Sequence, residues 1–140
     1  MDGGCRDYPG GMDSPARQTT TTGGILAAFG IDAVLVTVFA AIGRASHDEA
    51  AFAGLATTAG PFLLALIVGW LGVLAWRAPL AVRRTGIPLW IVTVAGGMLL
   101  RVLTGQGVQV AFVIVAASVL LLMLVGWRAV AALIARRRAR

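Results

Sequence analysis

The sequence predicts an all-α integral membrane protein, a four-helix bundle with both termini in the cytoplasm. Three observations lead to this fold class. Of the 140 residues, 59% are hydrophobic and 13% are charged, which leaves too little polar surface to cover a soluble core. The apolar residues gather in four runs, and about 20 helical residues cross the ~30 Å hydrocarbon core of a bilayer. The arginines between the runs fall almost entirely on one side of the implied membrane.

The four predicted spans are residues 24–43, 54–76, 87–104 and 108–127, which together form a transmembrane domain over residues 24–130. Their continuous apolarity excludes barrel strands, which would alternate over shorter segments. Residues 1–23 are rich in Gly, Asp, Pro, Ser and Thr and predict a disordered cytoplasmic tail. Residues 131–140 form an Arg-rich cytoplasmic tail.

The orientation follows from the arginines, which account for all 12 basic residues. With an even number of spans, ten of the 12 lie on the side of the two termini, and only Arg44 and Arg101 lie opposite. The positive-inside rule makes the arginine-rich side cytoplasmic. Trp76, Trp90 and Trp127 lie at run ends on the same side, where an aromatic belt is expected.

The basic tail predicts a contact with lipid. Arg136, Arg137, Arg138 and Arg140 follow a membrane span, and such residues each gain about 1 kcal/mol near an anionic leaflet. The tail has no interleaved aromatic residues or recognition motif, so we expect no nucleic acid as a partner. The expected partners are the lipid bilayer and either a second copy of the chain or another membrane protein, packed through small residues.

Asp32 is the residue of the spans that most needs an explanation. It lies roughly 10 Å below the cytoplasmic boundary, where an ionised carboxylate in lipid costs several kcal/mol. Counting along the helices places Trp70 and Thr93 at about the same depth. We therefore predict a buried polar site in which the Trp70 indole N–H and the Thr93 hydroxyl donate to Asp32. Arg101 differs from Asp32 in depth by roughly 12 Å and is expected to point toward the outer loops.

A second polar cluster is predicted at the outer face, formed by Arg44, His47, Asp48, Glu49 and Arg101. One interpretation is a pocket in which His47 titrates near neutral pH and the carboxylates bind a cation or a proton. The other, which we favour, is a solvated helix end with ordinary ion pairs. The spacing of these residues predicts no metal site, because it does not place three ligands on one face.

The chain also resembles a known family in a recurring set of residues. These are Asp32, Phe39, Gly43-Arg44, Ser46-His47, Pro61-Phe62, Gly69-Trp70, Gly97-Met98, Arg101 and Gly126-Trp127-Arg128. Over about residues 25–130 the pattern is similar to small bacterial membrane proteins grouped as domain of unknown function 3054. The resemblance implies a four-span protein of the bacterial plasma membrane and carries no established activity, cofactor or functional residue.

The expected function is a structural or accessory one, exerted through helix packing or through partners. The sequence contains no catalytic spacing, no cofactor loop and no metal-ligand pattern, so we expect neither an enzyme nor a cofactor. The alternative is a small proton- or ion-coupled transporter that uses Asp32. In size, span number and an acid in the first span, the chain is similar to the small multidrug resistance family, but it lacks that family's aromatic motifs and has Asp in place of Glu.

Overall fold

The computed structural model describes residues 21–45 and 54–140, and these residues form helices and turns with no strand. The helical elements are α1 (Thr22–Ala45), α2 (Leu55–Gly72), a 3₁₀ turn (Ala75–Arg77), a π-helical segment (Val82–Gly86), α3 (Ile87–Leu103), α4 (Val110–Leu120), a second π-helical segment (Leu121–Val125) and α5 (Gly126–Arg138). The predicted all-α fold class is confirmed.

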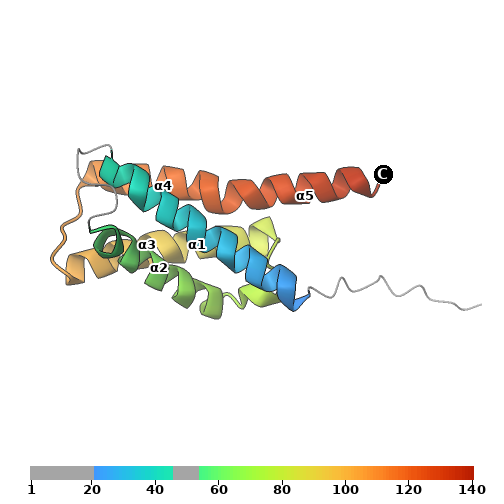
Figure 1. Cartoon of the computed structure of the whole chain (residues 1–140), viewed down its shortest axis with the longest axis horizontal. Coiled ribbons are helices and arrows are strands. Elements are labelled where there is room, and N and C mark those ends of the chain that lie inside the picture. The colour runs from blue at the N-terminus through green and yellow to red at the C-terminus, as the bar shows by residue number, and fades with distance from the viewer. Residues whose placement is uncertain (1–20, 46–53) are drawn as a thin grey trace, which may run out of the picture.

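Within the described residues, four helices are long and apolar enough to cross a membrane. They are Thr22–Ala45, Leu55–Gly72, Val82–Leu103 and Val110–Arg138. The fourth joins α4, the second π-helical segment and α5 into one continuous helix (Figure 1). This number of spans is the one that the hydropathy of the sequence predicts.

The helices define two ends of the bundle. At the terminal end α1 begins and α5 finishes, and α5 projects beyond the other helices there (Figure 1). At the distal end α1 finishes at Ala45 and α3 at Leu103. The connection between α2 and α3 lies at the terminal end, so the two helices form a hairpin that opens toward the distal end.

Three boundaries differ from the predicted spans by four residues or more. The third helix begins at Val82 instead of residue 87, because the π-helical segment Val82–Gly86 runs into α3. The second helix ends at Gly72 instead of Trp76, because Leu74 adopts the left-handed conformation (φ 52°) and the chain turns there. The fourth continues past Trp127 to Arg138, because residues 129–135 are all Ala, Val, Leu or Ile and support a helix. Of the predicted amino-terminal tail, residues 1–20 lie outside the described residues, and α1 already begins at Thr22.

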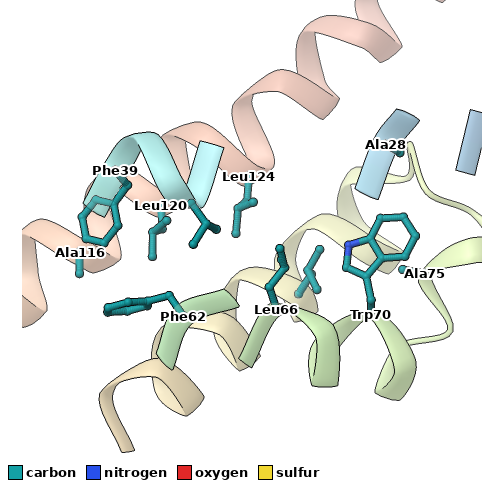
Figure 2. Packing of buried hydrophobic residues seen from close by; sticks show 11 residues of the cluster. Ala28, Phe39, Phe62, Leu66, Trp70, Ala75, Ala116, Leu120 and Leu124 are labelled. Atoms are coloured by element: carbon teal, nitrogen blue, oxygen red, sulfur yellow. The ribbon is translucent and has the colours of Figure 1, made fainter. Parts of the chain in front are cut away.

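The outer surface of the bundle is apolar, as a lipid-facing surface must be. Large side chains such as Leu103 (71% exposed) and Val110 (77% exposed) face outward, and such helices imply contact with lipid. The interior holds an apolar core in which Phe39 and Phe62 lie toward one end and Trp70 toward the other (Figure 2). The remaining core side chains shown between them are short aliphatic ones, among them Leu66, Leu120 and Leu124.

The closest helix pair is the α2–α3 hairpin, and glycines make its approach possible. A Cβ atom added at Gly97 would meet the Phe62 ring, with Cε1 at 2.6 Å, and one at Gly69 would lie 2.8 Å from Leu89 Cδ1. At Gly96 the nearest atom would be Ala65 Cβ at 2.9 Å. Small residues allow this kind of close packing in membranes, where lipid tails leave little hydrophobic drive for helix association.

We expect Gly97→Ala to destabilise the protein by about 1–3 kcal/mol, because the added methyl group overpacks the contact with Phe62. Gly30→Ala is the matched control, since a Cβ atom there meets nothing within 4 Å. Thermal unfolding of both variants in mild detergent, followed by circular dichroism, checks the prediction. Equal melting temperatures for the two variants would contradict it.

Candidate functional site

Asp32 lies at the centre of a polar cluster in an otherwise apolar bundle. Its side chain, on α1, has no exposed surface. The Oδ1 atom accepts hydrogen bonds from Trp127 Nε1 at 2.9 Å and Arg128 Nη1 at 2.7 Å. The Oδ2 atom accepts from Trp70 Nε1 at 2.9 Å and Arg128 Nη2 at 2.6 Å. We call Asp32, Trp70, Trp127 and Arg128 the Asp32 cluster.

Arg128 provides the counter-charge and is itself fully buried. It pairs with both carboxylate oxygens of Asp32 through its two terminal nitrogens, which is the bidentate geometry that makes such pairs strong. Its remaining bonds go to the backbone, from Nε to Pro79 O at 2.8 Å and from Nη1 to Leu124 O at 2.7 Å. Arg128 therefore connects α1, the α2–α3 connection and its own helix.

Two indole rings complete the cluster from different helices. Trp70 on α2 donates to Asp32 and is held by an edge-to-face contact with Phe29, at a centroid distance of 5.3 Å. Trp127, at the start of α5, donates to the other oxygen, and the Arg128 guanidinium carbon lies 4.7 Å from the centroid of its ring. Indoles suit this position because each adds a single donor to a large apolar body.

The backbone departs from regular α-helix in two segments that lie against Arg128. The π-helical segment Leu121–Val125 ends two residues before Trp127 and contains Leu124, whose carbonyl accepts from Arg128. Consecutive residues of a regular helix point about 100° apart. Trp127 and Arg128 are consecutive, yet both donate to the carboxylate of Asp32. Isolated π segments are rare and often occur at functional positions.

The second such segment, Val82–Gly86, shapes the wall on the other side of Arg128. A Cβ atom added at Gly86 would lie 3.2 Å from Arg128 Cδ, so a larger residue would crowd the arginine. Thr85 is buried and donates to Ala78 O at 2.7 Å, which ties the connection back on itself. This fold holds the neighbouring Pro79 carbonyl in place for Arg128.

Chemically, the Asp32 cluster contains an ion pair whose charges cancel and whose two side chains have no exposed surface. Each carboxylate oxygen already has two donors, which leaves no open position for a ligand. Neither the pocket at the distal end of the bundle nor a small one beside Arg77 and Arg84 is lined by Asp32 or Arg128. The geometry suits a contact that fixes helices relative to one another.

The sequence predicted the bond from Trp70 to Asp32 correctly, but the roles that it predicted for Thr93 and Trp127 need correction. Trp70 donates to Asp32, as depth counting predicts. The Thr93 hydroxyl does not: it is buried without a hydrogen-bond partner, because Trp70, Trp127 and Arg128 occupy both carboxylate oxygens. Trp127 faces the carboxylate instead of serving in an aromatic belt.

The main partner, Arg128, was missed because the fourth span was expected to end at Trp127. A signal for it was present in the seven apolar residues that follow, Ala129 to Ala135, which place the arginine inside a longer apolar helix. An intramembrane acid needs such a partner.

The predicted external cluster is described only in part. His47, Asp48 and Glu49 lie outside the described residues. Arg44 and Arg101 line the same pocket at the distal end. Arg44 Nη1 donates to Thr58 Oγ1 at 3.2 Å, and Arg101 Nη1 donates to Gln106 Oε1 at 2.9 Å, so Arg101 does point toward the loop as expected.

Within residues 21–45 and 54–140, no three His, Cys, Asp or Glu side chains come together in a way that could hold a metal ion.

These features define a multi-pass membrane protein with four helices able to span a bilayer and a buried ion pair between the first and the last. The chain belongs to the family described as Protein of unknown function (DUF3054), whose model matches residues 29–131 and so includes both Asp32 and Arg128. No curated protein and no solved structure matches the chain.

We expect Arg128→Met to destabilise the protein by about 3–5 kcal/mol, because Asp32 then stays buried without its counter-charge. Methionine keeps much of the side-chain length, so the lost charge dominates the effect. Arg83→Met is the matched control, since Arg83 is exposed and its replacement should change stability by less than about 0.5 kcal/mol. Unfolding in detergent measures both, and similar stabilities would refute the buried pair.

Thr93→Val and Thr85→Val test the hydrogen bonding of two buried hydroxyls. Thr93 has no partner, so its replacement by the similarly shaped valine should be neutral or stabilising. Thr85 donates to Ala78 O, so its replacement should cost about 0.5–1.5 kcal/mol. The same unfolding assay compares the two. A larger loss for Thr93→Val would show that its hydroxyl does have a partner.

Proposed function

We propose that this membrane protein has a structural or accessory role, exerted through helix packing and membrane partners, and that it is neither an enzyme nor an Asp32-coupled transporter. The observation that carries the proposal is the state of Asp32. A coupling carboxylate must exchange protons or ions with water. Asp32 has no exposed surface and accepts four hydrogen bonds, two of them from Arg128.

The cost of opening this site supports the same role. Uptake of a proton by Asp32 would leave Arg128 as a charge without a counter-ion, and breaking a buried ion pair costs about 3–5 kcal/mol. Arg128 also donates to Pro79 O and Leu124 O, and these two bonds hold its guanidinium group in place beside Asp32. A contact of this kind serves to keep the fourth span against the first.

We also propose that the protein lies in the bacterial plasma membrane with both termini in the cytoplasm. The distribution of arginines supports this orientation, because ten of the 12 belong to the terminal side and only Arg44 and Arg101 to the distal side. The bacterial membrane is the one that the family resemblance implies.

The projecting part of α5 is proposed to contact anionic lipid. Arg136, Arg137 and Arg138 form its last turn and are exposed, followed by Arg140. On the same helix Leu133 and other apolar side chains are exposed as well. Basic and apolar residues together on a helix that leaves the bundle suit the boundary between acyl chains and anionic headgroups.

The proposed partner is a second copy of the chain or another membrane protein. Gly30, Gly60 and Gly72 have no atom within 4 Å of an added Cβ position. Such positions let another helix approach a span closely.

Proton flux into proteoliposomes tests the proposed role. Wild-type protein is reconstituted with a pH-sensitive dye inside the vesicles, and a potential is imposed with potassium and valinomycin. We expect wild type, Asp32→Asn and the control Arg83→Met to give the flux of protein-free vesicles, because the carboxylate has no access to water. The comparison of wild type with protein-free vesicles does not depend on the folding of any variant.

A wild-type flux above that of protein-free vesicles, lost in Asp32→Asn and kept in Arg83→Met, would assign proton coupling to Asp32 and overturn the structural role.

A further inference from the structure

The distal end of the bundle contains a pocket of about 350 Å³, well separated from the Asp32 cluster. Its walls come from the ends of α1 and α3, from α2 and from the start of α4. Ligand pockets for small molecules typically measure about 300–1,000 Å³, so the volume suits a small organic ligand.

Arg101 is the residue of this pocket that lacks a full set of partners. Its Nη1 donates to Gln106 Oε1, and its guanidinium carbon lies 4.6 Å from the centroid of the Phe112 ring. The hydrogen bond and the ring contact together fix the position of the guanidinium group. The Nε atom is nevertheless buried with no hydrogen-bond partner. A buried donor without a partner is rare in proteins and costs free energy, so the guanidinium group of Arg101 is not fully satisfied by its own chain.

The other polar groups of the pocket are also suited to an anion. Arg44 approaches from α1 and donates to Thr58, which lines the pocket as well. Gln109 adds a second carboxamide beside that of Gln106. Among the described residues, the lining contains two guanidinium groups and no carboxylate.

The inner part of the pocket is aromatic. Phe39 and Phe112 line it, with ring centroids 6.4 Å apart, and Phe62 packs behind both of them at 5.6 and 6.2 Å. Such rings offer apolar surface to a ligand but no hydrogen bond. The pocket therefore combines a cationic rim with an apolar floor.

We propose that this pocket binds the oxyanion group, carboxylate or phosphate, of a small organic anion, with Arg101 as its main ligand. The planar guanidinium matches such groups, because its N–H donors lie in one plane and can bond two oxygens at once. The apolar part of the ligand packs against Phe39 and Phe112. This site is independent of the structural role proposed for Asp32.

Calorimetric titration of the full-length protein in neutral phosphatidylcholine nanodiscs tests the proposal, with hexyl phosphate, hexanoate and inorganic phosphate as probes. Hexanol and hexylamine share the alkyl chain and serve as uncharged and cationic controls. We expect saturable binding of the hexyl anions and none of the two controls. Arg101→Gln should weaken that binding about tenfold or more, because charge-assisted hydrogen bonds are lost.

Arg83→Gln is the matched control, since it removes an exposed arginine at the opposite end of the bundle and should bind as wild type does. Arg101→Lys keeps the charge without the planar fork, so its affinity should lie between those of wild type and Arg101→Gln. A melting temperature for each variant verifies that the protein is folded.

A second set of nanodiscs, containing phosphatidic acid, identifies the source of the oxyanion. If the phosphate belongs to a lipid headgroup, these discs should abolish hexyl phosphate binding to wild type, whereas for a soluble anion the binding should persist. Two results would overturn the proposal: no saturable binding of any anionic probe to wild type in neutral discs, or equal binding by wild type and folded Arg101→Gln.

Discussion

The buried pair between Asp32 and Arg128 is the contact on which the arrangement of the helices depends. Each of the two ions would be costly in the bundle alone, because desolvation of a charge is only offset by a well-placed counter-charge and further hydrogen bonds. Here the carboxylate has four donors, and the guanidinium also reaches two backbone carbonyls. The requirement to satisfy both ions selects one position of the fourth span against the first.

Around this pair, packing divides the bundle into parts held by different forces. The α2–α3 hairpin relies on close backbone approach at Gly69, Gly96 and Gly97. The fourth span also contributes Leu120 and Leu124 to the apolar core. Polar contacts attach it in addition, since Trp90 on α3 donates to Ala117 O at 2.9 Å and Arg128 reaches Asp32 on α1. The hairpin thus depends mainly on close packing, whereas the fourth span combines packing with directional bonds.

The sequence predicted the fold well because span number depends on hydropathy alone. It predicted the Asp32–Trp70 contact through depth, which residue counting along a helix can give. Counting does not give rotation about the helix axis, and for this reason Thr93 was paired wrongly. The two π-helical segments have no marker in the sequence, although Leu121–Val125 ends only two residues before Trp127.

The separation of the paired residues along the chain has a consequence for biogenesis. Asp32 and Arg128 are 96 residues apart, and ribosomes add about 5–20 residues per second. The first segment therefore enters the bilayer on the order of 5–20 s before its salt-bridge partner has been synthesised. During that interval the aspartate must stay near the surface or be sheltered by the insertion machinery. Emergence of Arg128 then allows the pair to form, so the fourth helix closes the bundle around Asp32.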